Sequence, residues 1–303
     1  MERFNKANFK THEDPIYFRN AVISMAQRAG FLSSMIEKDY YCSLILAYLY
    51  QDPKTNLVFK GGTCLSKVYV DFYRMSEDLD FVIPAKPETS RKDRSRLMGP
   101  IKEQLADITE KYACFNIYEK FRGFNESRQY IGALSYHSVI EPEKKPGTIK
   151  IEIGMREELM LDAIWQETST LLIDPFNEQK IIPDFKTQCL SIEELFAEKF
   201  RAALSRREPA IRDYFDVFYA MHNLDINFES DSFLTLVKEK LSIPQNDPIS
   251  ISKIRKKQLQ NQIDTELKPV LRAKDFEQFE FELVYSLVER VALKISNYHL
   301  SSK

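Results

Sequence analysis

The sequence contains unusually little glycine. Only 8 of its 303 residues are glycine, which is about 2.6% against a usual share of roughly 7%. Collagen-like sequences and glycine-rich linkers are thereby excluded. Two of the eight glycines, Gly61 and Gly62, are nevertheless adjacent. At this point two consecutive residues can adopt backbone conformations that other residues rarely adopt.

Long apolar runs are also missing. The longest, Leu44 to Tyr50, is far shorter than the roughly 18 residues that a membrane-spanning helix requires. The N-terminal sequence MERFNKANFKTHEDP has neither the apolar region of a secretory signal nor the acid-poor composition of a transit peptide. We therefore expect a cytoplasmic protein that has no membrane partner.

The cysteines form no recognisable pattern. They are far apart, without a C-x-x-C pair or a histidine at metal-ligand spacing, at Cys42, Cys64, Cys114 and Cys189. Such cysteines are typical of reduced, mostly buried thiols. Neither a zinc site nor a disulfide framework is expected.

No excess of charge of either sign is present. The chain has 43 Lys and Arg against 45 Asp and Glu, for a formal net charge of -2. This balance argues against a protein coated with positive charge for nucleic-acid binding, although a local basic groove stays compatible with it. With 44% hydrophobic residues, the chain can bury a sizeable core in one large domain or two modest ones.

Helix and strand patterns follow each other in the first 190 residues. Asp14 and Pro15 are typical of a helix start, and Gly30 is typical of its end. Ser34 and Glu37 form an S-x-x-E capping box, which predicts a second helix up to Tyr50. Further patterns predict a strand at 57–59, a short helix at 63–69, a strand at 79–83, a helix at 90–111, and strands at 115–121, 129–139 and 148–154.

The pattern changes to helix alone near residue 190. Ser191 and Glu194 form another capping box, and helical periodicity follows at 192–207, 213–222, 233–241 and 276–295. We therefore expect a mixed α/β (α+β) fold with two domains. Residues 1–190 would form a mixed sheet with flanking helices, and residues 191–303 a helical C-terminal domain.

The adjacent glycines lie where a strand turns into a helix. Glycine lets the backbone approach an anion closely, and the N–H groups at the helix start, with Thr63 beside them, can bind phosphate oxygens. Downstream, Asp78 and Asp80 are two residues apart on a predicted strand, so both side chains project from one face. Two such carboxylates suit a hard divalent cation, and magnesium prefers one or two carboxylates plus substrate phosphates.

Each of these two features is weak alone. An acidic-x-acidic pattern should occur roughly seven times by chance in this chain, so a solvated strand start would be the default interpretation of Asp78 and Asp80. An adjacent glycine pair is expected only about 0.2 times at this glycine frequency, and it lies one short helix before the carboxylates. The combination therefore indicates a nucleotide site.

Several motifs together resemble a known family. The runs FKGGTCLSKVY (59–69) and RMSEDLDF (74–81) are similar to the signature of the AbiEii/AbiGii-type nucleotidyltransferase toxins, members of the polymerase-β-like nucleotidyltransferase superfamily. The resemblance extends upstream to IEKDY (36–40) and downstream to ELFAEK (194–199) and RDYFD (212–216). It covers roughly residues 30 to 220, with the motifs in the expected order.

The resemblance implies roles for matching residues. The nucleotidyltransferase fold would place Gly61, Gly62 and Thr63 at the triphosphate. Asp78 and Asp80 would be catalytic residues that ligate Mg²⁺.

The resemblance also implies roles outside these two motifs. Lys199 would contact the triphosphate, with Asp213 supporting it or the incoming substrate. Glu152, an acid between apolar neighbours on a predicted strand, is a candidate third metal ligand. It could equally face water on an edge strand.

Lys199 and Asp213 each have a second interpretation. Lys199 borders an apolar stripe of its predicted helix, so it either extends its ammonium to solvent or has a partner. Asp213 could instead be a charge that complements the N-terminal end of a helix dipole. The helix-dipole role of Asp213 is compatible with a functional one.

Three further residues border the predicted nucleotide site. Lys67 lies one turn after Thr63, where it could face phosphate or be an exposed helix lysine. Ser66 and Ser76 could bind nucleotide, although hydrogen bonding to local backbone is the more common role of such hydroxyls.

These motifs predict a magnesium-dependent nucleotidyltransferase that moves NMP from NTP to an acceptor hydroxyl. The family resemblance implies the toxin of a toxin–antitoxin or phage-defence (abortive infection) system, with an antitoxin partner and the tRNA 3′ end as acceptor. Two alternatives stay open: transfer to a protein or small molecule, and a non-catalytic protein that binds NTP and interacts with partners. The paired carboxylates speak against the last of these, because a non-catalytic module does not need them.

Overall fold

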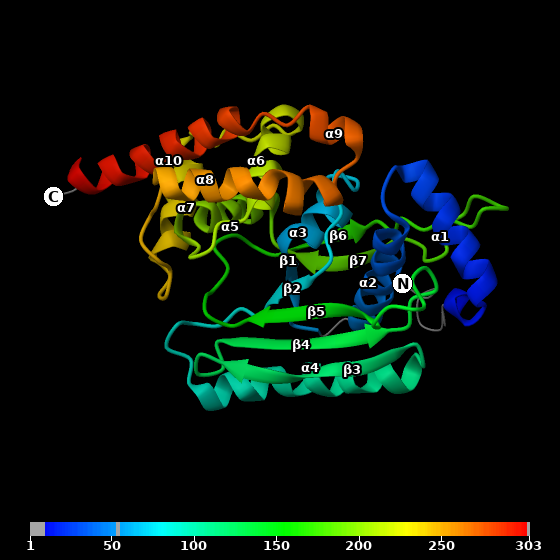
Figure 1. Cartoon of the computed structure of the whole chain (residues 1–303). Coiled ribbons are helices and arrows are strands. Elements are labelled where there is room, and N and C mark those ends of the chain that lie inside the picture. The colour runs from blue at the N-terminus through cyan, green and yellow to red at the C-terminus, as the bar shows by residue number, and fades with distance from the viewer. Residues whose placement is uncertain (1–9, 53–54, 302–303) are drawn as a thin grey trace. The chain divides into compact units, whose positions relative to one another are not determined.

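The chain forms two compact units. In the computed structural model, residues 10–52 and 55–301 are described, with side chains as far as Ser296. The first unit is Met1–Leu190 and the second is Ser191–Lys303. The first contains the sheet and its helices, and the second is helical (Figure 1).

One mixed sheet organises the described part of the first unit. It is composed of β1 (Val58–Lys60), β2 (Leu79–Val82), β3 (Phe115–Phe124), β4 (Gln129–Tyr136), β5 (Gly147–Gly154), β6 (Ile164–Thr168) and β7 (Phe185–Cys189). The strand order is β3-β4-β5-β2-β1-β7-β6. β2 pairs parallel with β5, β1 pairs parallel with β7, and the other neighbours pair antiparallel. The short strands β1 and β2 therefore lie at the centre of the sheet.

Helices cover one face of this sheet. The helical segments of the first unit are η1 (Thr11–Glu13), α1 (Pro15–Ala29), α2 (Ser33–Leu49), α3 (Gly61–Cys64), the π-helical turn η2 (Leu65–Tyr69) and α4 (Arg91–Lys111). Tyr41 of α2 stacks on Tyr136 of β4, and Lys102 of α4 lies over the ring of Tyr130. Helices α2 and α4 therefore pack on the face of β4 that carries Tyr130 and Tyr136, and α4 runs along β3 (Figure 1).

Local signals account for the ends of α1 but not for the start of α2. Asp14 accepts a hydrogen bond from the Tyr17 N–H, and Gly30 ends α1 with a left-handed φ of 74°, as predicted. The prediction that Ser34 caps α2 is wrong, because α2 begins at Ser33 after Leu32, which makes no side-chain cap. Most residues of α2 are buried. Packing of these side chains in the core, and not a cap, therefore stabilises this helix.

The predicted mixed α/β class is confirmed by this sheet and its helices. Strands β6 and β7 were not predicted, because both are defined by pairing with other segments, β6 with β7 and β7 also with β1. The central residues of β6 are exposed, so its pattern of alternation is weak. The predicted short helix at 63–69 begins earlier, at Gly61, and continues as the π-helical turn.

The second unit has a separate aromatic core. Its helical segments are α5 (Ile192–Ser205), α6 (Ile211–Asn223), α7 (Asp231–Ser242), α8 (Lys253–Gln262), η3 (Ile263–Leu267), η4 (Lys268–Val270), α9 (Ala273–Glu277) and α10 (Phe281–Ser301). Ser191 caps α5 by accepting from the Glu194 N–H at 3.2 Å, as its capping box predicts. Phe200 of α5 packs against Phe228 and Phe233 at ring-centre distances of 5.2 and 5.4 Å. A core of this kind can hold the helices of the second unit together.

Among residues 10–52 and 55–301, none of the helices has the length and apolar character that crossing a membrane requires.

Candidate active site

The strand register aligns three charged residues across the middle of the sheet. Asp80 of β2 lies opposite Lys60 of β1 and opposite Glu152 of β5. Residues directly opposite in a sheet project from the same face, so these three side chains share one face. Asp78 precedes β2 by one residue, and its spacing from Asp80 places it on that face as well.

The first glycine of the pair makes room for Asp80. Gly61 has a φ of 77°, which non-glycine residues rarely adopt. A Cβ at this position would collide with the carboxylate of Asp80, where Oδ2 is its nearest neighbour. Glycine is therefore required here both for the backbone conformation and for the close approach of the start of α3 to Asp80.

The second glycine and Thr63 contact the segment that carries the carboxylates. A Cβ on Gly62 would lie 2.5 Å from Arg74 Nη2 and 3.0 Å from Ser76 Oγ. The Thr63 hydroxyl donates to the main-chain carbonyl of Asp78 at 2.5 Å and lies 2.9 Å from Ser76 Oγ. The two sequence motifs thus pack into one structural unit in which the glycine turn fixes the backbone of the carboxylate segment.

Glu152 is engaged by two side chains on the same face. Gln129 Nε2 donates to Glu152 Oε1 at 2.5 Å, and Lys150 Nζ lies 2.9 Å from Oε2. Burial raises the pKa of Glu152, but the bonds from Lys150 and Gln129 outweigh burial and lower it overall. The charge of Lys60 adds to this lowering of the pKa, so Glu152 is a carboxylate anion at neutral pH.

The carboxylates do not form a complete metal cage. In the described parts of the chain, no group of three or more His, Cys, Asp or Glu side chains is arranged to hold a metal ion. Asp78 and Asp80 are an oxygen-donor pair, and Glu152 stays a predicted third ligand whose two oxygens contact Gln129 and Lys150. An oxygen pair of this kind matches the preference of Mg²⁺ for a few carboxylates completed by water and phosphate.

Lys67 and Ser66 point into the protein interior. The Lys67 ammonium is fully buried and lies 2.7 Å from Asp39 Oδ1 of α2, with the Phe72 ring 4.8 Å from it. This position differs from the predicted one, because a lysine paired in the core faces neither solvent nor a phosphate. The Ser66 hydroxyl donates to the main-chain carbonyl of Arg74, which is the backbone role that sequence reasoning favoured.

Lys199 lies in the second unit between two aspartates. Its ammonium is 2.8 Å from Asp213 Oδ1 and 2.8 Å from Asp216 Oδ2. Asp216 is fully buried, and Arg206 approaches the other oxygen of Asp213 at 3.6 Å. Of the two interpretations of Lys199, partnered or extended to solvent, the structure has the partnered one. Asp213 also lies in the first turn of α6, where its charge complements the helix dipole.

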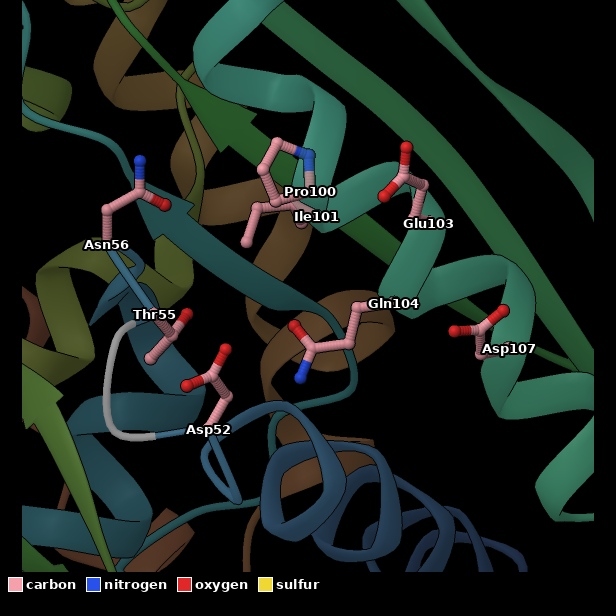
Figure 2. A pocket seen from close by; sticks show the side chains of 8 residues that line it. All are labelled: Asp52, Thr55, Asn56, Pro100, Ile101, Glu103, Gln104 and Asp107. Atoms are coloured by element: carbon pink, nitrogen blue, oxygen red, sulfur yellow. The ribbon is translucent and has the colours of Figure 1, made fainter.

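A separate pocket of about 360 Å³ lies between α4 and the loop after α2 (Figure 2). It is lined by Asp52, Thr55, Asn56, Pro100, Ile101, Glu103, Gln104 and Asp107. None of these is a predicted site residue. Three carboxylates line this pocket, and they would repel a triphosphate.

Comparison with known proteins decides the family. The family model described as "Nucleotidyl transferase AbiEii toxin, Type IV TA system" matches residues 45–292. The chain belongs to this family. It is therefore a nucleotidyltransferase, and the AbiEii model covers both units, from α2 to α10. The resemblance found in the sequence motifs is confirmed.

Two solved structures from Helicobacter pylori are similar to this AbiEii-family chain. JHP933 has 17% sequence identity and a TM-score of 0.49, over 89% of this chain and 97% of that one. A protein described as a candidate nucleotidyltransferase has 17% identity and a TM-score of 0.46, over 90% and 99%. The comparison with curated proteins finds no match, so membership of the AbiEii family rests on the family model.

Four residues near the predicted site residues were missed by sequence reasoning. They are Lys60, Gln129, Lys150 and Asp216. Asp213 and Asp216 are three apart, which places both on one face of a helix, so that spacing could have identified Asp216. Gln129 lies 23 positions before Glu152, and only the strand register brings the two together.

Proposed function

We propose that this AbiEii-family enzyme transfers NMP from NTP to the 3′ hydroxyl of tRNA, with Mg²⁺ bound by Asp78 and Asp80. Residues 1–190 would be the catalytic domain and residues 191–303 a helical second domain. The observation that carries the proposal is the packing of the glycine turn against the carboxylate segment, through Gly61 and Asp80 and through Thr63 and Asp78.

The glycine turn would bind the triphosphate. Its backbone N–H groups lie at the start of α3, where they have no intrahelical acceptor. Gly61 and Gly62 let this backbone approach a polyanion closely. The Thr63 hydroxyl already donates to the main-chain carbonyl of Asp78. Its proposed role is therefore to fix the position of the glycine turn relative to the carboxylates.

The carboxylates supply the centre for a hard cation. The oxygen donors of Asp78 and Asp80, beside a turn suited to phosphate, fit Mg²⁺. When bound, Mg²⁺ would neutralise charge on the triphosphate and favour the ionised form of the acceptor hydroxyl.

The reaction exchanges one phosphorus–oxygen bond for another. The acceptor oxygen bonds to the α-phosphorus, and the bond from that phosphorus to the α–β bridging oxygen breaks. The electron pair leaves with pyrophosphate, and the proton of the hydroxyl passes to water. Because phosphoryl transfer depends mainly on positioning and charge stabilisation, the residues of this chain need only hold the triphosphate and the carboxylates in place.

Lys199 is proposed as a further contact of the triphosphate. Its ammonium is held by Asp213 and Asp216 at 2.8 Å each, which restricts an otherwise flexible side chain. A fixed cation loses less entropy when it binds a phosphate. Asp213 and Asp216 would therefore act through Lys199 as positioning residues.

The family gives the biological setting. The chain belongs to a toxin family of type IV toxin–antitoxin systems, so we propose a partner antitoxin and a role in phage defence. Modification of the tRNA 3′ end would stop translation, because an altered acceptor end cannot be aminoacylated normally. That consequence would explain both toxicity and the need for an antitoxin.

The proposed function is tested by following a label. Purified protein is incubated with Mg²⁺, total RNA and each NTP labelled at the α-phosphate, and wild type is compared with Asp80→Ala. We expect label on tRNA with wild type and almost none with the variant. Label on protein or on a small molecule would favour those acceptors. NTP binding without pyrophosphate release would favour a non-catalytic protein, and equal labelling by the two proteins would exclude the catalytic role of Asp80.

A further inference from the structure

A lysine lies among the carboxylates of the candidate active site. Lys150 and Glu152 are two apart on β5, so both project from the sheet face that carries Asp80. The Lys150 ammonium is 2.9 Å from Glu152 Oε2, and 45% of the Lys150 side chain is exposed. The lysine is therefore accessible and is paired with the predicted third carboxylate.

The strand register also places Lys150 near the other two carboxylates. β2 and β5 run parallel with Leu79 opposite Ile151, so the next position along brings Asp78 beside Lys150. The ammonium is therefore paired with Glu152 and lies on the sheet face that carries Asp78 and Asp80.

An ammonium in this position opposes the entry of a cation. A divalent ion at Asp78 and Asp80 would be repelled by Lys150 and would compete with it for the carboxylate charge. A triphosphate changes this balance, because its negative charge can pair with Lys150 while it supplies further oxygen ligands to the ion. Lys60, opposite Asp80, adds positive charge on the same face.

We propose that Lys150 acts as a competitor of the divalent cation, which keeps the carboxylate centre weakly binding for metal alone and makes tight metal binding depend on the triphosphate. This inference rests on the proposed function, in which Asp78 and Asp80 hold the ion. It assigns Lys150 as a positioning residue that couples the binding of metal to the binding of NTP.

The test measures Mn²⁺ binding to the full chain by calorimetry, with and without a non-hydrolysable NTP analogue. Lys150→Met removes the charge and keeps most of the length of the side chain, and Lys150→Arg keeps the charge. Lys186→Met on β7, two strands away from β2, is the matched control. Because Lys150 is half exposed, we expect each variant to fold, which circular dichroism verifies.

Without the analogue, we expect Lys150→Met to bind Mn²⁺ about tenfold more tightly than wild type, as loss of one nearby repulsive charge predicts. The gain in Mn²⁺ affinity on adding the analogue should shrink in this variant. Lys150→Arg and Lys186→Met should behave like wild type. Unchanged or weaker Mn²⁺ binding by Lys150→Met, or an Arg variant that matches the Met variant, would overturn the inference.

The outcomes separate this inference from the proposed function. If wild type labels tRNA and Lys150→Met leaves Mn²⁺ affinity unchanged, the function stands and the competitor role fails. If no acceptor is labelled but Lys150→Met tightens Mn²⁺ binding, the competitor role stands and the proposed transfer to tRNA fails.

Discussion

Gly61 combines a backbone conformation that only glycine adopts readily with a close contact to the Asp80 carboxylate. Its φ of 77° and the contact of its missing side chain with Asp80 are separate reasons for glycine. A strained backbone and a displaced carboxylate would both follow from any side chain there. Because glycine is scarce elsewhere in the sequence, the adjacent pair at Gly61 and Gly62 indicates a special backbone position from the sequence alone.

We therefore expect Gly61→Ala to lose nucleotidyl transfer by roughly 100-fold or more, because it displaces a group required for charge stabilisation. It should also lower the free energy of unfolding by about 1–2 kcal/mol, since φ is positive. Gly99→Ala is the control: Gly99 lies inside α4 with nothing within 4 Å of its Cβ position. That variant should keep full activity and gain about 0.5–1 kcal/mol. Equal effects of the two variants in urea unfolding and activity assays would contradict this account.

Asp216 is expected to act on NTP binding through Lys199. It is fully buried and 2.8 Å from Lys199, so Asp216→Asn keeps its shape and removes its charge. We expect the variant to raise the KM for NTP by roughly tenfold, because Lys199 loses one of the groups that position it.

Steady-state kinetics with NTP as the varied substrate measure this effect. Asp216→Glu should recover part of the NTP affinity if charge is what matters. A KM unchanged from wild type in Asp216→Asn would show that Asp216 does not act through Lys199.

At the scale of elements, a buried ion pair links α2 to the turn after the glycines. Lys67 of η2 and Asp39 of α2 are 2.7 Å apart, with 0% and 4% of their side chains exposed. Nearby, Lys38 and Glu77 are 2.8 Å apart but 18% and 37% exposed. Removal of one partner from a buried pair leaves an uncompensated charge, whereas a surface pair contributes little.

We expect Asp39→Asn to lower the free energy of unfolding by about 3–5 kcal/mol, because it strands the Lys67 ammonium in the core. Lys38→Met should cost no more than about 1 kcal/mol. Denaturant unfolding of both variants, followed by circular dichroism, makes the comparison. Similar losses in the two variants would contradict the buried role assigned to Lys67.

Elements with strong local signals were predicted well, and those defined by long-range pairing were not. Asp14 and Gly30 bound α1, and Ser191 starts α5, because caps act within a few residues. β6 and β7 are short strands that exist through pairing, β6 with β7 and β7 also with β1. Pairing between segments is not visible in local propensity.

The same limit applies to the candidate site. The sequence motifs predicted Asp78, Asp80 and the glycine turn, because each lies within one short segment. The position of Lys67 in the core depends on Asp39, 28 residues away, and sequence reasoning did not predict it.

At the scale of the whole molecule, the chain divides at Leu190 and Ser191 into two units. The second has buried apolar side chains of its own from several helices, such as Phe200, Val237 and Val288. A segment with its own hydrophobic core can in principle fold alone.

We therefore expect a fragment of residues 191–303 to be monomeric and helical by circular dichroism, with a cooperative thermal transition. The full chain provides the reference spectrum. A fragment without a cooperative transition would mean that residues 191–303 are not an independent domain.

Catalysis of transfer to RNA by the carboxylates beside the glycine turn is checked by measuring the mass of the RNA product. Purified tRNA is incubated with NTP, Mg²⁺ and either wild type or Asp80→Asn, and intact-mass spectrometry and pyrophosphate release are measured together. We expect wild type to add whole NMP units to tRNA with one pyrophosphate per unit, and Asp80→Asn to add essentially none. A tRNA mass unchanged by wild type, or the same mass gain with both proteins, would contradict this expectation.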